Sequence, residues 1–423
     1  MATAKKATHF PNFDRGGEPA ERMHPLKELT KRLTETYGTP GNEQLIREVI
    51  REEIKSIADE IRVDALGNLI ARKKGSGGAV PRKKVMLAAH IDEIGVIVTH
   101  VDEKGFLRFA TLGGVRPITL FGHRCRFANG VSGIFGREKK DAKPTDVEMD
   151  KLFIDVGARE AKDVPVGVGD AAGFWRDFAD LGDRMIAKAM DDRIGCVALI
   201  EVMRQLKKSP HDLYFVYTVQ EEVGLRGATT SAYGVQPDLA LAVDVTDTGD
   251  TPESTPMAVA LGKGPAIKVK DSGMLAHPAV KELLVNVAQE AKIPYQLEVL
   301  VGGTTDAMAM QTTREGVPAG VVSIPTRYVH TPSEMVDMND VQNAVKLLVN
   351  VLSNPIKLDY VVLVGKPPRS GLCLAAFGGT AWTRERGGHD HQVVCNHAPT
   401  EPAFHTTLAT IETAIQTARA ASR

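Results

Sequence analysis

Short runs of consecutive apolar residues alternate with helix-periodic segments along two stretches of the chain. The runs occupy residues 85–89, 213–219, 239–243 and 319–324. Runs of this length indicate strands that are buried on both faces of a sheet, and the intervening segments have the spacing of amphipathic helices. The pattern predicts an α/β fold built on a doubly wound mixed sheet.

The apolar spacing also predicts individual elements. It favours a helix over residues 45–61, for which Asn42 is a plausible N-cap, because Asn side chains accept the first free N–H groups of a helix. Further helices are predicted at 192–206, 278–291 and 340–352, and a pair of strands around 63–71 and 84–89.

Residues 93–175 have a different texture. Helical periodicity is absent there, and β-like segments at 95–101, 106–110, 123–127 and 152–156 are separated by Gly-rich turns. This predicts a small β-barrel-like domain inserted into the α/β domain, which would then be discontinuous and consist of residues 23–92 and 176–354.

The two ends of the chain lack a folding pattern. Residues 1–22 are polar and contain Gly and Pro, which predicts a mobile leader and makes Met23 an alternative start. Residues 355–423 are rich in breakers and only 403–421 is weakly helical, which predicts a poorly ordered tail. The tail carries four metal-ligand residues, for which we expect adventitious binding rather than a functional site: His389, His391, Cys395 and His397.

Composition excludes some partners. The 423 residues are 43% hydrophobic and 25% charged, and 52 basic against 53 acidic residues give a net charge of −1, so nothing favours nucleic acid or membrane as a partner. No apolar run approaches the ~18 residues of a membrane helix, and the N-terminus lacks a signal core. Four scattered cysteines fit a reducing compartment, so we expect a cytoplasmic protein.

Carboxylates and histidines follow the predicted strands. The carboxyl ends of parallel strands meet at one sheet edge, so these side chains should converge there. Glu221 and Glu222 are adjacent, and like charges resist burial together unless a metal site requires them. The candidate residues are His90, Asp92, Asp191, Glu221, Glu222, Asp244 and His330.

Imidazole and carboxylate ligands suit zinc, cobalt or manganese. Five ligands with one shared carboxylate suit two ions, which can activate a bridging water, and either Glu221 or Glu222 could then act as general base. Asp92 lies two residues beyond His90 and could accept the free ring N–H of that histidine, fixing its tautomer.

Each candidate also has a structural interpretation. A histidine at a strand end is often satisfied within the core, Asp191 could cap a helix, and the two glutamates could be solvated. Only the common placement favours a site. The polar segment 302–307 could be a turn and N-cap, or it could line a pocket through Gly303 and Thr305, with Asp306 facing a substrate amine.

Several strings resemble those of the tetrahedral (TET-type) co-catalytic metallo-aminopeptidases, the glutamyl or deblocking aminopeptidase family. They are AAHIDEIGVIV, AMDDRIGC, QEEVGLRGA, AVDVTDT, GKGPAI and RYVHTPSEM, within about residues 24–354. The resemblance implies that His90 and Asp244 hold one ion and that Glu222 and His330 hold the other. It further implies that Asp191 bridges the two ions and that Glu221 is the general base.

The resemblance also implies two divalent ions per chain, with zinc as the first choice and cobalt or manganese as alternatives. It implies short peptides as substrates, and dimers, formed through the inserted domain, that assemble into a tetrahedral dodecamer. The chain departs from the family at Thr304, where a glycine is usual, in a somewhat short insert and in its tail.

Three other functions compete with an aminopeptidase. A related deacylase or amidase would use the same chemistry, and an inactive structural shell would keep only the fold. A glucanase is not supported, because glycoside cleavage uses a carboxylate pair across a sugar cleft without metal.

Overall fold

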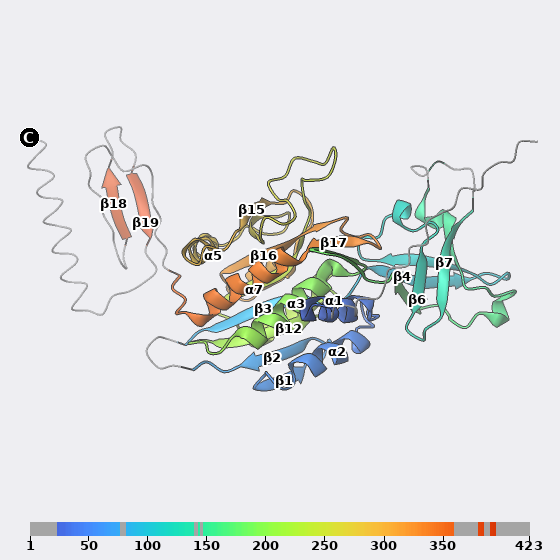
Figure 1. The fold of residues 1–423 in the computed structure, drawn as a ribbon, viewed down its shortest axis with the longest axis horizontal. Helices are drawn as coiled ribbons and strands as arrows, with labels where there is room; N and C mark the ends of the chain where they lie inside the picture. The colour runs from blue at the N-terminus through green and yellow to red at the C-terminus, as the bar shows by residue number, and fades with distance from the viewer. Residues whose placement is uncertain are drawn as a thin grey trace, which may run out of the picture. The chain divides into compact units, whose positions relative to one another are not determined.

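The computed structural model describes residues 23–76, 82–138, 143, 147–358, 380–384 and 390–394, the last two ranges by their backbone alone. The chain divides into two compact units, Met1–Pro355 and Ile356–Arg423. The first unit contains a large mixed sheet with helices packed on it and a separate β-barrel (Figure 1).

The large sheet has four parallel strands at its centre. In the order β12, β3, β13, β16 each strand pairs in parallel with the next, and antiparallel strands extend the sheet on both sides. The full order is β1 (Glu60–Val63), β2 (Leu69–Lys73), β12 (Asp212–Thr218), β3 (Lys84–His90), β13 (Leu239–Thr246), β16 (Ala319–Arg327), β17 (Glu334–Asp337), β11 (Arg184–Ala187) and β10 (Ala179–Leu181), with β14 (Ala266–Lys270) and β15 (Gln296–Val299) joined through β16. The predicted fold class is confirmed.

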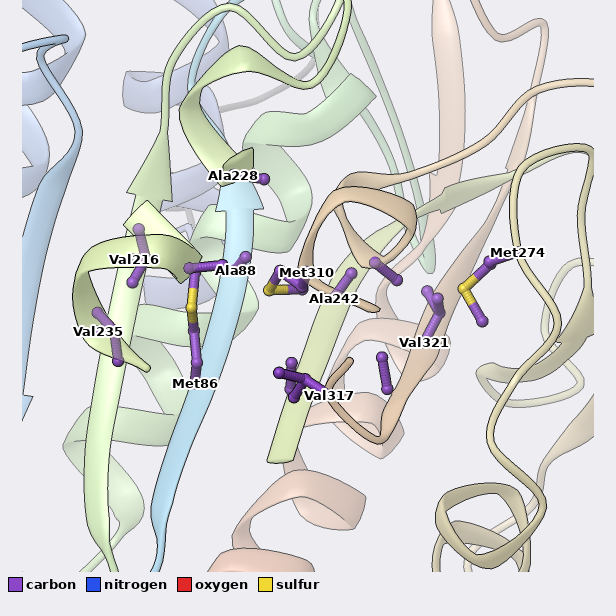
Figure 2. Packing of buried hydrophobic residues seen from close by; sticks show 14 of the residues in the cluster. Met86, Ala88, Val216, Ala228, Val235, Ala242, Met274, Met310, Val317 and Val321 are labelled. Atoms are coloured by element: carbon purple, nitrogen blue, oxygen red, sulfur yellow. The ribbon is translucent and has the colours of Figure 1, made fainter. Parts of the chain in front are cut away.

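Helices pack on the sheet, and every residue of a central strand such as β13 is therefore buried. On one side α4 and α6 bring small residues and Met310 against Met86 and Ala242 (Figure 2). The helix α3 also contacts β3 and β13, and it packs against α1 and α7. The helices are α1 (Pro25–Glu35), α2 (Gln44–Ile54), α3 (Met190–Gln205), α4 (Arg226–Val235), α5 (Pro278–Glu290), α6 (Asp306–Gln311) and α7 (Met338–Ser353).

The barrel lies between Gly95 and Phe174, within the predicted insert. Its strands close in the order β4 (Gly95–Val101), β5 (Phe106–Leu112), β8 (Leu152–Asp155), β7 (Ser132–Arg137), β6 (Arg124–Phe127) and β9 (Ala171–Phe174). Alternate residues such as Phe127, Phe135 and Ile154 fill a hydrophobic core of its own. The predicted β-barrel-like domain is therefore present, and its role in pairing of chains stays a prediction.

Two local predictions near the N-terminus are wrong. The predicted helix over 45–61 runs only from Gln44 to Ile54, so its N-cap is Glu43 rather than Asn42. The Glu43 side chain caps no N–H group of the helix and instead accepts the N–H of Gly41 at 2.7 Å. Residues 63–71 are not one strand, since the Asp64 carboxylate accepts successive backbone N–H groups and closes a turn between β1 and β2.

The strands predicted around 63–71 and 84–89 are also not neighbours. The strand β12, which comes much later in sequence, lies between β2 and β3 and pairs with both. A period of two residues identifies a strand but carries no information on its partner.

Of the second unit the structure describes residues 356–358 and two strands, β18 (Thr380–Arg384) and β19 (Asp390–Val394), which pair antiparallel. The leader 1–22, the weak helix 403–421, and His389, Cys395 and His397 lie outside the described residues, as does the side chain of His391. The predictions for these segments remain predictions. Within the ranges that the structure describes, no helix is long and apolar enough to cross a membrane.

Candidate metal centre

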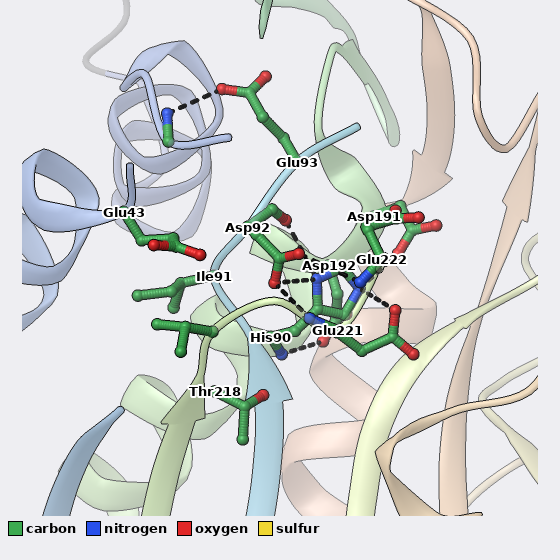
Figure 3. A network of polar contacts seen from close by, with 12 residues as sticks. Glu43, His90, Ile91, Asp92, Glu93, Asp191, Asp192, Thr218, Glu221 and Glu222 are labelled. Carbon is green, nitrogen blue, oxygen red and sulfur yellow. Dashed lines mark hydrogen bonds and ion pairs between the residues drawn. The ribbon is translucent and has the colours of Figure 1, made fainter. Parts of the chain in front are cut away.

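The ligand-type residues predicted from separate strand ends converge on one edge of the large sheet. Figure 3 shows four of them: His90, Asp191, Glu221 and Glu222. His90 ends β3, Asp244 lies in β13, Glu221 and Glu222 follow β12, and His330 follows β16. Asp191 is added from the start of α3. Donor atoms of three groups lie within 4.8 Å of one another: His90–Glu221–Glu222, His90–Asp192–Asp244 and Asp191–Glu222–His330.

Asp191 occupies the middle of this arrangement. One carboxylate oxygen, Oδ1, lies 2.9 Å from His90 Nε2, and the other, Oδ2, lies 3.2 Å from His330 Nε2. Glu222 Oε1 is 3.3 Å from His330 Nε2, whereas Asp244 Oδ1 is 4.0 Å from His90 Nε2. The two oxygens of Asp191 therefore serve two neighbouring groups of donors.

In this centre the carboxylates outnumber the groups that can carry a positive charge. Burial raises the pKa of Asp244 and that of Glu221 well above the ordinary range, and neighbouring carboxylates raise them further. Burial would also raise the pKa of Asp191, but hydrogen bonds from His330 and His90 outweigh it and lower that pKa. No described lysine or arginine forms an ion pair with these carboxylates.

The two histidines carry the opposite shift. Burial would lower the pKa of His90, but the carboxylates of Glu221 and Asp191 raise it well above 6.5. The same competition raises the pKa of His330 to about 12, through Asp191 and Glu222.

This donor set fits divalent cations. Imidazole and carboxylate are the ligand types that zinc, cobalt and manganese accept, and such cations would offset the excess of buried negative charge. Glu222 Oε1 is buried and accepts no hydrogen bond although His330 is near, so the atom keeps a free lone pair for a ligand. The residues that are present therefore fit the metal that the sequence predicts.

Asp92 is placed as predicted but makes different bonds. The ring nitrogen Nδ1 of His90 lies 3.1 Å from the backbone oxygen of Asp92 and 3.5 Å from its carboxylate, so the backbone carbonyl is the nearer acceptor. The carboxylate itself accepts the N–H groups of Glu221 at 3.0 Å and Glu222 at 3.1 Å. Asp92 therefore fixes the loop that carries the two glutamates.

Sequence reasoning did not single out Asp192 for a role of its own. Its side chain is fully buried, and its two oxygens accept the N–H groups of His90 at 3.2 Å and Gly195 at 3.1 Å. The peptide bond between Asp191 and Asp192 is cis. Burial raises the pKa of Asp192 well above its ordinary value, with Asp244 adding to the effect. Its position beside Asp191 was the only signal in the sequence.

Glu334 was also missed. One of its oxygens accepts the N–H of Asp191 at 3.0 Å and the other accepts the N–H of His330 at 2.8 Å. Burial, followed by the charge of Asp191, raises the pKa of Glu334 to about 8. The string HTPSE contained this residue, but nothing in the spacing showed that its carboxylate accepts the backbone N–H groups of two ligand-type residues from different elements.

Unusual backbone conformations surround the centre. Ala189, Gln220, Tyr328 and His330 all have φ between 54° and 63°, in the left-handed region that residues with a side chain seldom adopt. Such conformations cost energy and persist where the surrounding structure holds them, which is frequent at functional sites. The bond from His330 N–H to Glu334 is one such restraint.

A cavity of about 750 Å³ opens onto the centre. Its wall includes the ligand-type residues, the segment 302–305, Tyr328 and, from the barrel, Gly114 and Arg116. Gly303 and Thr305 thus line the cavity, as predicted. Asp306 does not: its side chain is buried and accepts a hydrogen bond from Thr218. The predicted contact between Asp306 and a substrate amine has no support in this geometry.

Known proteins share both the sequence and the fold. A lysyl aminopeptidase of Pyrococcus furiosus is 38% identical over 349 residues, which are 79% of this chain and 98% of that protein. The aminopeptidase APDkam598 of Desulfurococcus kamchatkensis matches with a TM-score of 0.74 and 42% identity, over 78% of this chain and 94% of its own.

The TET1 peptidase of Pyrococcus horikoshii, which assembles into a tetrahedron or a large octahedral shell, matches with a TM-score of 0.69 and 32% identity over 77% of this chain and 99% of its own. The model of the M42 glutamyl aminopeptidase family matches residues 67–347, more than half of the chain. The relatives are peptidases that remove N-terminal residues, and the resemblance read from the sequence motifs is confirmed. The chain therefore belongs to the M42 glutamyl aminopeptidase family.

Proposed function

We propose that this aminopeptidase depends on two divalent cations held at the sheet edge. The observation that carries the proposal is the position of Asp191, whose two oxygens face His90 and His330 separately. His90 and Asp244 would hold one ion and Glu222 and His330 the other, with Asp191 shared between them. Bound ions of this kind polarise a carbonyl group and supply a hydroxide nucleophile near neutral pH. Zinc is our first choice, with cobalt or manganese as alternatives.

Glu221 is the proposed general base. Its Oε2 lies 3.9 Å from His90 Nε2, so the carboxylate stands beside the residues that would hold the ions. A carboxylate within reach of the attacking water can accept its proton. It would take a proton from the attacking water and deliver it to the leaving amine. Asp92 supports this role indirectly, by holding the N–H of Glu221.

Short peptides with a free amino terminus are the proposed substrates. The cavity of about 750 Å³ has room for a few residues, and its carboxylate-rich wall favours a cationic amine. The finer assignments stay proposals on the same footing: pairing of chains through the barrel, assembly of dimers into a tetrahedral dodecamer, and a cytoplasmic location. For the location, support comes from Cys125 and Cys196, which are buried and unbridged.

Side-by-side hydrolysis of one peptide in free and N-acetylated form tests the proposed function. Each reaction is run with and without chelator, and after addition of zinc, cobalt or manganese. We expect metal-dependent cleavage in which the acetylated peptide is at least ~100-fold slower, because a buried carboxylate without its amine partner is costly. Faster cleavage of the acetylated form would establish a deacylase instead, and a protein that binds no divalent ion and cleaves nothing would be an inactive shell.

Glu221→Gln tests the role of the base. The change keeps the size of the side chain and removes its proton-accepting capacity, so turnover should fall by roughly 10²–10⁴-fold. Metal content, measured on the same preparation, should stay at the wild-type level. Full turnover in this variant would exclude Glu221 as the base.

A further inference from the structure

The barrel contributes a loop to the wall of the active-site cavity. A side chain at Gly113 would place its Cβ 2.9 Å from Glu222 Oε2, and one at Gly114 would place its Cβ 2.3 Å from His330 Nδ1. Gly113 also has φ of +82°, which few other residues adopt. The two glycines therefore allow the loop to lie directly against the ligands, and Arg116 follows two residues later.

Arg116 stands out electrostatically in that cavity. Among the described residues of the wall it is the one lysine or arginine, and the same wall contains five carboxylates: Asp191, Glu221, Glu222, Asp244 and Asp247. Its side chain is exposed, and its guanidinium forms no hydrogen bond or ion pair with a described residue. Burial raises the pKa of Asp247; the charge of His330 opposes the rise most, and the charge of Arg116 opposes it to a smaller extent.

A guanidinium in this position has a clear chemical preference. Its planar fork of N–H donors matches a carboxylate with two parallel hydrogen bonds, and the group stays charged at every physiological pH. The histidines and carboxylates of the centre suit the amine and the carbonyl of a substrate. A carboxylate elsewhere on that substrate would find no described lysine or arginine in the centre itself.

We propose that Arg116 binds a carboxylate group of the peptide substrate, so that the inserted barrel takes part in substrate selection. The inference rests on the proposed aminopeptidase function. Two parts of a peptide can supply such a carboxylate: the side chain of an acidic N-terminal residue, or the free carboxyl terminus of a short peptide. Both use the same recognition chemistry, and the substrates of the test separate them.

The test compares kcat/KM within two matched pairs of substrates. Glutamyl against glutaminyl anilide changes only the side-chain carboxylate, and Leu-Gly against Leu-Gly amide changes only the carboxyl terminus. The wild type is compared with Arg116→Ala, with Arg116→Lys, and with Arg159→Ala, which removes an exposed arginine of the same barrel from outside the cavity wall.

Arg116→Ala should lower the acid-to-amide ratio in at least one pair by about 10- to 100-fold, the usual effect of losing a charged hydrogen-bond pair. Arg116→Lys should keep part of the ratio, and Arg159→Ala should keep all of it. The pair that responds identifies the source of the carboxylate.

Three results would overturn the inference. The ratios of Arg116→Ala could equal those of the wild type, or Arg159→Ala could change them equally. If the wild type cleaves none of the four substrates, the proposed function fails and the inference fails with it. If the wild type cleaves them and Arg116 has no effect on either ratio, only the inference fails.

Discussion

Two clusters of charged residues lie side by side at the end of β3, and they differ in whether lysine or arginine neutralises their carboxylates. The metal centre, defined by His90, Asp191, Glu221, Glu222, Asp244 and His330, has carboxylates without lysine or arginine. The second, which we call the Glu93 cluster, consists of Glu93, Lys188 and Arg193. Lys188 Nζ lies 2.6 Å from Glu93 Oε2, and Arg193 Nη2 lies 3.8 Å from Oε1. Figure 3 shows Glu93 pointing away from Asp191 and Glu222.

The Glu93 cluster is complete within the chain. Besides its cations, Glu93 accepts the N–H of Gly38, and Arg193 donates to the backbone oxygens of Ile91 and Leu33. Burial lowers the pKa of Lys188, but the carboxylate of Glu93 opposes the effect. Every charge in this cluster has its partner once the chain has folded.

The metal centre is less completely buried, since the side chain of His330 is 33% exposed, and no described lysine or arginine pairs with its carboxylates. Removing a charge from water is costly unless a countercharge is present, and the described part of the chain supplies only two histidines here. The difference shows how the fold uses one strand end twice. Glu93 helps to secure the structure around the centre, and the residues on the other side are left to be neutralised by cations from solution.

Asp191→Asn should have the largest effect on the metal centre. The shared carboxylate would lose its charge, so both ions should be lost together and turnover should fall by more than the ~10⁴-fold that removal of acid–base help can cause. Counting of metal per chain by mass spectrometry checks the result. His330→Ala is the matched variant, which should empty mainly one position. An Asp191→Asn protein that retains two tightly held ions would exclude a shared ligand.

Lys188→Met should damage the other cluster. Glu93 would remain buried with only the more distant Arg193, and breaking a buried ion pair in this way typically costs ~3–5 kcal/mol of unfolding free energy. Urea denaturation measures it. The double variant Lys188→Met with Glu93→Gln should recover part of the loss, because the uncompensated charge is then absent. A loss below ~1 kcal/mol would show that Glu93 is adequately paired without Lys188.

The sequence was sufficient to place the elements of the sheet edge that hold the ligands. Central strands such as β3 and β13 are buried on both faces, so they appear as uninterrupted apolar runs, and polar residues after them are conspicuous. Three of the long helices were found for a similar reason. The apolar spacing of α3, α5 and α7 continues for more than ten residues.

Other features left no readable pattern. The six residues of α6 are too few to show a helical period, and Thr305 caps it through a local bond to Ala307 N–H. Asp192 and Glu334 act by accepting backbone N–H groups from residues distant in the sequence, a function that any carboxylate could perform. Such roles depend on tertiary geometry, and a single sequence does not encode them in its spacing.

Asp306→Asn tests how a buried carboxylate without a cation makes the unfolding free energy depend on pH. Burial raises the pKa of Asp306 from 3.8 to about 6, although a bond from Thr218 opposes it. The folded state therefore holds this proton more tightly than the unfolded state. The stabilising effect is full below about pH 4 and is lost as pH rises through about 6.

The measurement is the unfolding free energy of metal-free protein from pH 4 to pH 8. Between these limits the wild type should lose up to ~3 kcal/mol relative to Asp306→Asn, as expected for a pKa shift of about two units. Thr218→Val is a useful control, since it removes the neighbouring hydroxyl and keeps the carboxylate. Parallel stability curves for wild type and Asp306→Asn would contradict the raised pKa.

Glu334→Gln should have the smallest effect, but the chain offers an unusually close control for it. A glutamine has one acceptor oxygen, so it can accept only one of the two N–H groups, from Asp191 or from His330, that Glu334 now accepts. Asp340 makes the same double contact elsewhere, accepting the N–H groups of Gly262 and Gly264 at 2.7 Å each. Asp340→Asn thus removes a similar restraint from a place that is not among the candidate ligand groups.

If Glu334 positions the ligands, zinc affinity should fall by ~10–100-fold in Glu334→Gln, as is typical when a partner of the ligands is lost, and remain unchanged in Asp340→Asn. Both variants should unfold at lower temperature, so melting alone would not separate them. Competition of each protein with a chromogenic chelator measures zinc affinity directly and so separates the two variants. The binding of both ions should weaken together, because Glu334 restrains both the shared ligand Asp191 and His330, which belongs to one position. Equal zinc affinity in the two variants would show that Glu334 stabilises the fold without positioning the ligands.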